Sequence, residues 1–178
     1  MIHICLQAHP DGSAGSAKEE KNKAVYTPQA NSRHCFVCGL DNPFGLQLRF
    51  YETAPGEVVV EHTLPAEYQG YPGVAHGGIV AAMLDEAAGR AHMGGDPPRF
   101  MYTARLAINY RKPVPVGQPI RLVGRAGKSR NRTAEATSAI YDAGGVLLAE
   151  AEALLVDVPP AVLETSNLEE LGWKVYPD

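Results

Sequence analysis

The sequence predicts an α+β fold in which an antiparallel sheet packs against one long helix. A single stretch rich in Ala, Met and Leu, residues 76–93, has the composition of a long helix, and the Gly and Pro residues of 94–98 stop it. The segments after it have the pattern of consecutive strands joined by short turns, which suit antiparallel pairing. A parallel doubly wound sheet would need repeated crossover helices, for which the sequence offers no segments.

Strands are predicted on both sides of the helix. Leu46, Leu48 and Phe50 alternate with polar residues, which predicts a half-buried strand. Residues 58–60 predict a second strand, with a turn at residues 55–56 between the two. Four further strands are predicted near residues 99–111, 118–128, 132–142 and 145–157.

Composition limits the class of protein. A chain of 178 residues with 45% hydrophobic residues suits one domain with a sizeable core. The net charge of -4 argues against nucleic-acid and anionic-membrane partners. The apolar runs are shorter than the roughly 20 residues that span a bilayer, and the first residues lack the pattern of a signal peptide. We therefore expect a cytoplasmic protein.

Three parts of the chain differ in composition. Residues 1–30 include a small, polar and charged stretch without hydrophobic periodicity, which predicts a mobile leader. Residues 31–158 carry the helix and strand patterns and form the expected domain. Residues 159–178 are expected to be a C-terminal appendage.

The sharpest motif is the Gly-rich segment of residues 70–78, which leads directly into the helix. Its last residues are His76, Gly77 and Gly78, and paired glycines allow a ligand to approach the backbone closely. The first N–H groups of a helix have no partner within it and favour negative charge, so they could stabilise a carbonyl oxygen that gains charge. His76 could orient a substrate or brace the turn. The same residues would also suit a tight turn that only packs the helix against the sheet.

Asp85 is the second candidate residue, because it lies in the apolar part of the helix. A carboxylate in such surroundings is costly unless it is paired or used in chemistry. Gly78 and Asp85 are seven residues apart, on one stripe of the helix and separated by roughly 10 Å along its axis. A site containing both groups would therefore be assembled from two chains. Glu86 is expected to be an exposed helix charge.

These residues resemble those of hotdog-fold acyl-CoA thioesterases of the phenylacetate-degradation type. The resemblance lies in Gly73, in the residues 76–78, and in Asp85 nine positions after His76. It implies a curved antiparallel sheet wrapped around the helix, in homodimers or homotetramers with shared active sites. It further implies that the Gly78 N–H of one chain holds the thioester oxygen, while Asp85 of the partner acts as nucleophile or general base. Coenzyme A would enter only as part of the acyl-CoA substrate, with no separate cofactor.

The resemblance extends through residues 103–113 and implies that Thr103 holds the attacking water, although β-propensity alone would also favour Thr in a strand. Alternation places Thr103 and Asn109 on the face opposite to that of Leu106, and Asn109 is a candidate for substrate binding. Some relatives carry an Asn or Gln side chain shortly before the His, near the water. Gln69 is the nearest residue of that kind and the weaker candidate.

A group of basic residues lies at the turn between the predicted strands 118–128 and 132–142. In a net acidic protein, such a cluster suits the phosphates of coenzyme A, although it also suits a solvated hairpin tip. The candidate residues for substrate binding in this turn are Arg125, Lys128, Ser129, Arg130 and Arg132.

Cys35 and Cys38 form a Cys-x-x-Cys pair before the first predicted strand. A structural zinc site normally needs four ligands, the sequence has no second such pair, and Cys5 lies in the predicted leader. A redox role lacks the surrounding βαβ pattern. We therefore expect no metal site, and interpret the pair as part of a turn that seats the leader on the core.

Two other functions remain open at this stage. An enoyl-thioester hydratase or dehydratase would keep the fold and use a different motif with a catalytic His. A non-catalytic acyl-CoA-binding module could keep the Gly-rich turn but would not need Asp85.

Overall fold

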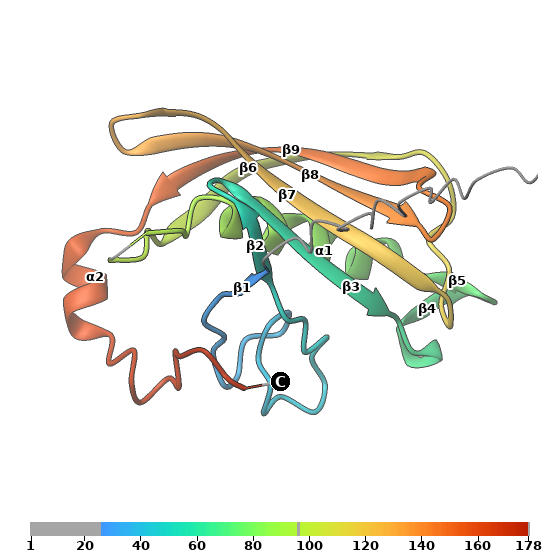
Figure 1. Cartoon of the computed structure of the whole chain (residues 1–178), viewed down its shortest axis with the longest axis horizontal. Helices are drawn as coiled ribbons and strands as arrows, with labels where there is room; N and C mark the ends of the chain where they lie inside the picture. The colour runs from blue at the N-terminus through green and yellow to red at the C-terminus, as the bar shows by residue number, and fades with distance from the viewer. Residues whose placement is uncertain (1–25, 96, 178) are drawn as a thin grey trace, which may run out of the picture.

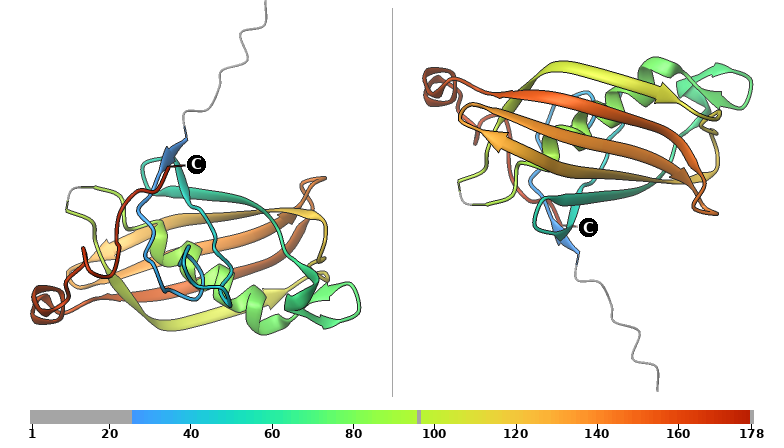
Figure 2. Two further views of the ribbon diagram at one scale, coloured as in Figure 1. Left: turned by 90° about the horizontal axis from the view of Figure 1, so that it is seen from below. Right: turned by 90° about the horizontal axis from the view of Figure 1, so that it is seen from above.

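A seven-stranded antiparallel sheet curves over one long helix in the computed structural model, which describes residues 26–95 and 97–177. The helix α1 crosses one face of the sheet diagonally (Figure 1 and Figure 2). The elements, in chain order, are β1 (Thr27–Pro28), β2 (Tyr51–Ala54), β3 (Glu57–Thr63), the 3₁₀ helix η1 (Ala66–Tyr68), β4 (Gln69–Tyr71), β5 (Val74–Ala75), α1 (Gly77–Arg90), β6 (Met101–Tyr110), β7 (Pro119–Arg130), β8 (Thr133–Asp142), β9 (Leu147–Asp157) and α2 (Pro160–Thr165).

The strand order confirms the predicted α+β architecture. It runs β1-β2-β3-β7-β8-β9-β6, and β4 pairs with β5 in a separate two-stranded sheet. The four strands predicted after the helix correspond to β6, β7, β8 and β9. The strand that follows α1 in the chain, β6, lies at the edge of the sheet, where it pairs with β9.

The helix lies close to the sheet because small residues stand beneath it. A Cβ atom at Gly124 of β7 would overlap the carbonyl oxygen of Ala87 in α1. Beside Gly124 in the neighbouring strand, Ser138 donates a hydrogen bond to the carbonyl oxygen of Leu84 at 2.7 Å. The apolar residues that α1 buries are Val80, Met83, Leu84, Ala87 and Ala88.

The prediction of a strand at residues 46–50 is wrong, although its pattern of burial is correct. Leu46, Leu48 and Phe50 are all buried. The segment is nevertheless not part of the sheet, because Leu46 and Leu48 donate backbone hydrogen bonds to residues 36 and 37 instead of to a strand. Gln47 has a φ of 51°, which breaks the extended conformation. The strand β2 begins only at Tyr51.

The two ends of the described chain lie beside each other. Residues 27–28, within the expected leader, form β1 and pair with β2, while residues 1–25 lie outside the described part. Lys174 of the C-terminal appendage exchanges backbone hydrogen bonds with Asn31, at 2.8 and 3.1 Å. None of the helices in the described ranges has the length and apolar character needed to cross a membrane.

Candidate active site

The Gly-rich turn forms a small hairpin, β4–β5, that ends at the start of α1. His76 caps the helix, and its Nδ1 atom accepts a hydrogen bond from the N–H of Gly78 at 3.0 Å. An Nδ1 atom that accepts carries no proton, so in a neutral ring the proton is on Nε2, which is left able to donate. The Tyr110 hydroxyl of β6 donates to the Gly77 carbonyl oxygen at 2.9 Å, which fastens the helix start to the edge strand.

Gln69 serves the hairpin that carries His76. Its Oε1 atom accepts a hydrogen bond from the Gly73 N–H at 3.2 Å, across the turn between β4 and β5. Gly70 lies directly against His76, since a Cβ atom there would be 3.2 Å from the His76 Cα. The structure therefore brings Gln69 to the same hairpin as His76, with its side chain engaged in holding the turn.

Asp85 is half-buried on α1, and its carboxylate forms no hydrogen bond or ion pair with any other residue of the described ranges. One turn further along the helix, Gly89 has open space where a side chain would be. The spacing of seven residues separates Asp85 from Gly78 by roughly 10 Å, since each residue of an α-helix rises 1.5 Å. This distance is long for one substrate carbonyl to lie beside both groups of a single chain.

The expectation of an exposed Glu86 is wrong. Its carboxylate pairs with Arg90 at 2.9 Å, and the side chains of Glu86 and Arg90 are only 22% and 1% exposed. The other oxygen of Glu86 lies 3.9 Å from the Cys35 sulfur. Glu86 has these neighbours because successive residues point about 100° apart around a helix, which turns it away from the side of Asp85 and toward the Cys35–Cys38 turn.

A β-bulge in β6 changes the predicted orientation of Thr103. Thr103 pairs with Leu155, and Arg105 with Leu154, so Ala104 is the extra residue of the bulge. Leu155 is fully buried, and residues paired across antiparallel strands share a face. Thr103 therefore lies on the same face of the sheet as Leu155, the face that α1 crosses, although its own side chain is exposed. The expectation that alternation would put it on the opposite face is wrong, since alternation counts every residue and a bulge skips one.

Asn109 lies beyond the bulge on the outer face of β6. Ile108 packs against the core, and its neighbour Asn109 is exposed on the other side of the strand. Thr103 and Asn109 thus lie on opposite faces of β6, and the structure does not bring them together.

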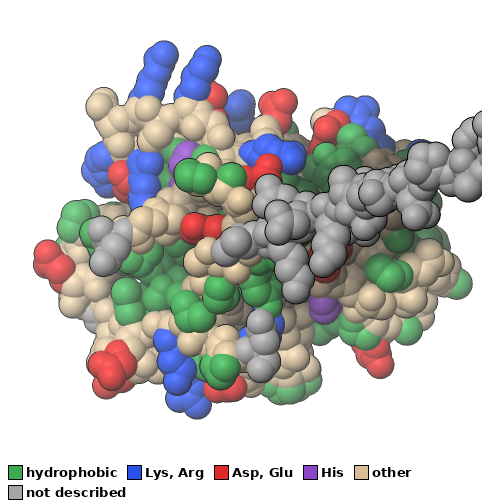
Figure 3. All heavy atoms as spheres, in the orientation of Figure 1, with side chains coloured by type: hydrophobic (Ala, Val, Ile, Leu, Met, Phe, Trp, Pro, Cys, Tyr) green, Lys and Arg blue, Asp and Glu red, His purple; other side chains and the backbone are tan. Residues whose placement is uncertain are grey.

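Some residues of the basic turn already have side-chain partners, and others are exposed. Arg125 pairs with Glu57 at 2.8 Å, and the Ser129 hydroxyl accepts a hydrogen bond from Arg99 at 2.7 Å. Basic side chains project where the β7–β8 hairpin ends (Figure 3). Lys128, Arg130 and Arg132 are exposed there, and the first two line a hollow of about 170 Å³ together with Glu135.

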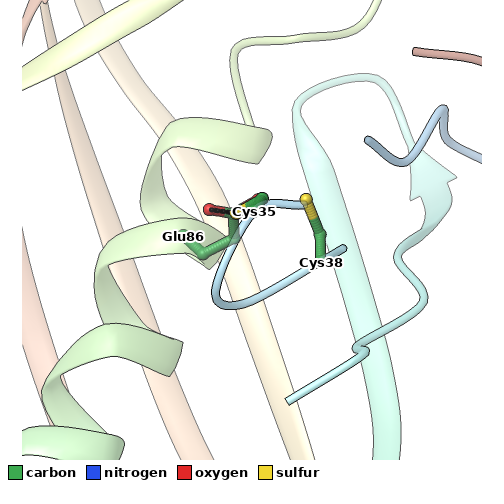
Figure 4. A group of neighbouring side chains, drawn as sticks. All are labelled: Cys35, Cys38 and Glu86. Carbon is green, nitrogen blue, oxygen red and sulfur yellow. Dashed lines mark hydrogen bonds between the residues drawn. The ribbon is translucent and has the colours of Figure 1, made fainter. Parts of the chain in front are cut away.

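The two cysteines meet Glu86 in a cluster that the sequence did not reveal. The sulfur atoms of Cys35 and Cys38 and a carboxylate oxygen of Glu86 lie within 4.8 Å of one another (Figure 4). A hydrogen bond from the Cys38 thiol lowers the pKa of Cys35 to about 6, and the same bond together with burial raises the pKa of Cys38. Because Glu86 is 51 residues from Cys35 and carries no motif of its own, spacing could not link the two segments.

A curved antiparallel sheet wrapped around one long helix is the architecture of the hotdog fold. Residues 72–149 match the model of the thioesterase superfamily, and this segment holds His76, Asp85 and Thr103. This part of the chain is thus similar to the thioesterase superfamily, in agreement with the resemblance in its sequence.

Individual relatives agree with this assignment. Acyl-coenzyme A thioesterase THEM4 of Rattus norvegicus is 32% identical over 89 residues, which cover 49% of this chain and 37% of the relative. The chain thus spans little more than a third of that protein's length. Among solved structures, the thioesterase superfamily protein RHA08564 is 32% identical with a TM-score of 0.65, over 70% of this chain and 61% of that one.

Two more distant structures share the fold alone. The Escherichia coli PaaI protein of the phenylacetic acid degradation operon is 16% identical with a TM-score of 0.58, over 64% of this chain and 81% of its own. A hypothetical thioesterase of Streptococcus pneumoniae TIGR4, solved with coenzyme A, is 20% identical with a TM-score of 0.57, over 62% and 88%.

Proposed function

We propose that the protein is an acyl-CoA thioesterase that uses Asp85 to hydrolyse a small or medium acyl or aryl thioester. The observation that carries this proposal is the position of Asp85, a half-buried carboxylate with no partner in the described chain, on the stripe of α1 that begins at Gly78. The match of residues 72–149 to the thioesterase superfamily supports it, as does the coenzyme A bound to the Streptococcus pneumoniae relative.

The start of α1 is the proposed site for the thioester oxygen. No described residue accepts a hydrogen bond from the Gly77 N–H, and the Gly78 N–H donates to His76. As the thioester carbon is attacked, its oxygen gains negative charge and becomes a better acceptor than the imidazole nitrogen. The substrate oxygen would then replace the imidazole nitrogen as the acceptor of the Gly78 N–H.

Asp85 of the partner chain would supply the base or nucleophile. As a base, it takes a proton from a water molecule, whose oxygen attacks the thioester carbon while coenzyme A leaves as its thiol. As a nucleophile, it forms an acyl-enzyme anhydride that water then hydrolyses. The Thr103 hydroxyl is available to position the water in either route, because the bulge turns it to the face of α1.

The edge strand β6 is the proposed place where the two chains join. In the described sheet it pairs only with β9, so its other edge is free to continue the sheet into a second copy. Tyr102 and Tyr110 on this strand are 53% and 55% exposed, and Tyr110 contacts the helix start at Gly77. Pairing along β6 would bury these aromatic side chains beside the site.

The exposed residues Lys128, Arg130 and Arg132 are the proposed contacts for the phosphates of coenzyme A. Asn109, on the outer face of β6, is a further proposed contact for the substrate. Arg125 and Ser129 are the lesser candidates, since Glu57 and Arg99 already engage them.

Thiol release from a panel of acyl-CoA and aryl-CoA substrates tests the proposal. We expect thiol release with at least one substrate, and its loss in Asp85→Asn. Hydration of crotonyl-CoA without thiol release would favour the hydratase alternative. Tight binding of acyl-CoA without any turnover would favour a binding module.

A further inference from the structure

The sequence alone predicted no metal site, but the fold adds Glu86 to the two cysteines. We propose that Cys35, Cys38 and Glu86 bind a thiophilic divalent cation, with Zn²⁺ as the ion that fits this donor set best. The site is separate from the proposed thioesterase chemistry, and its ligands come from two parts of the chain. Two are in the turn that precedes the buried segment of residues 46–50, and the third is on α1, next to Asp85 (Figure 4).

The geometry of the donor atoms agrees with a single bound ion. All three lie within 4.8 Å of one another. Ligand atoms held 2.0–2.3 Å from a tetrahedral Zn²⁺ are themselves roughly 3.5–4 Å apart, so small movements would complete the site. Two sulfur ligands and one carboxylate favour Zn²⁺ over Mg²⁺ or Ca²⁺, which prefer oxygen.

The cysteine turn is shaped to hold negatively charged sulfur. The backbone N–H of Val37 points at the Cys35 sulfur at 3.3 Å, as a donor to a thiolate would. Gly39 donates its N–H to the Cys35 carbonyl oxygen at 2.9 Å, and a Cβ atom at Gly39 would overlap the Cys35 backbone. The tight turn therefore depends on Gly directly after the Cys-x-x-Cys pair.

Glu86 is oriented toward the sulfur atoms by the residue behind it. Its Oε1 atom accepts the bond from Arg90 at 2.9 Å, which leaves Oε2 on the side of Cys35. Arg90 is itself fixed between the rings of Phe50 and Trp173, at 4.7 and 5.1 Å, and donates to the Ala30 carbonyl oxygen. Metal-binding side chains in proteins are commonly held by such a second hydrogen bond.

The charges of the cluster balance when a divalent cation is present. Two thiolates and one carboxylate carry three negative charges, and Arg90 with one Zn²⁺ ion supplies three positive charges. Because thiolates and not thiols bind the ion, binding would release the thiol protons. Cys35 and Glu86 are partly exposed, so water can take the fourth position of the tetrahedron.

The ion would join the cysteine turn to α1 beside the proposed catalytic residue. Apart from the weak contact between Cys35 and Glu86, these two segments meet through apolar packing. Metal removal should therefore loosen residues 35–48 from the helix and lower the thermal stability of the protein.

Metal analysis of the full-length protein, purified without a histidine tag from zinc-supplemented cells, tests the proposal. We expect stoichiometric zinc in the wild type and in Cys5→Ser, which removes the remaining cysteine. Cys35→Ser should lose the metal, and Glu86→Gln should bind Zn²⁺ at least about 10-fold more weakly. Cobalt-substituted protein should show the thiolate-to-cobalt charge-transfer band and the strong visible absorption of tetrahedral Co²⁺.

A second measurement uses the wild type alone, in case the variants do not fold. Zn²⁺ added to metal-free, reduced protein should protect two thiols from alkylation and raise the melting temperature. The absence of stoichiometric binding and protection would overturn the proposal, as would equal zinc content in Cys35→Ser. A third outcome is a disulfide between Cys35 and Cys38 whose reduction does not give a protein that binds zinc. That result would overturn the metal site and identify the two cysteines as a redox pair.

Discussion

Asp85 and Glu86 are adjacent carboxylates with different surroundings. Glu86 neutralises the buried Arg90 and faces two cysteines, whereas Asp85 has no partner in the described chain. The helix separates them, because a step of one residue turns a side chain by about 100°. A pair of matched amide substitutions can therefore distinguish a chemical role from a structural one.

In the first prediction, Asp85→Asn lowers kcat for thiol release by roughly 10²–10⁴ with little change in stability, since it removes a base. Glu86→Gln should instead destabilise the fold by about 1–3 kcal/mol, because Arg90 would stay buried without its countercharge. Steady-state kinetics and denaturant unfolding of both variants check this. A Glu86→Gln enzyme without turnover but with native stability, beside an active Asp85→Asn enzyme, would reverse the assignment.

Two substitutions test whether the Thr103 hydroxyl positions the water: one removes the hydroxyl and the other keeps it. Thr103→Ala should lower kcat by about 10-fold, because the attacking water loses one hydrogen bond, while KM changes little. Thr103→Ser keeps the hydroxyl and should retain most of the activity. Equal kcat values for the Ala variant and the wild type would remove Thr103 from the mechanism.

His62 on β3 should make stability depend on pH. Burial lowers its pKa below the ordinary 6.5, and its Nε2 atom is buried without a hydrogen-bond partner in the described chain. The unfolded chain therefore binds the proton more readily, so the contribution of His62 to stability is present above about pH 6.5 and is lost as the pH falls below it. Unfolding free energies at about pH 7.5 and pH 5.5 should differ more for the wild type than for His62→Gln.

At the scale of the element, periodicity was enough to predict the long helix, the strands β6 to β9 and the inward positions of residues 46–50. It could not predict the bulge at Ala104, since an unpaired residue leaves no mark in the alternation. Gln47 likewise has a positive φ that its residue type does not indicate. In the site, sequence reasoning placed His76, Gly78 and Asp85 on one helix. The contacts of Glu86 with Cys35 required the fold.

The close packing of α1 on the sheet can be tested with two glycines. Gly124→Ala should destabilise the protein by roughly 1–3 kcal/mol, because the new methyl group would overlap the Ala87 carbonyl oxygen. Gly89→Ala adds the same group to α1 in open space and should stabilise it by up to about 1 kcal/mol. Denaturant unfolding of both variants measures the contrast, and equal effects would contradict it.

At the scale of the whole molecule, the shared-site arrangement predicts complementation between two inactive variants. Gly78→Pro removes the proposed oxyanion N–H, which lies in the first turn of α1 and has no acceptor within the helix, and Asp85→Asn removes the base. Refolding the two together should recover roughly a quarter of wild-type activity, since half of the dimers are mixed and each has one intact site. The wild type should sediment as a dimer or tetramer. A fully active monomer, or no recovery on mixing, would contradict a site built from two chains.

The backbone clasp between Asn31 and Lys174 has a mechanical consequence. Residues 29–33 and 171–177 run side by side at one corner of the molecule, and Arg33 and Leu171 are joined there as well (Figure 2). A pulling force applied through residues 29 and 177 would break the hydrogen bonds between these two segments one after another. The long ladders between β7, β8 and β9 would carry no load until the clasp had opened. A pull that is only strong enough to open the clasp would therefore detach this corner and leave the helix and its carboxylate in place.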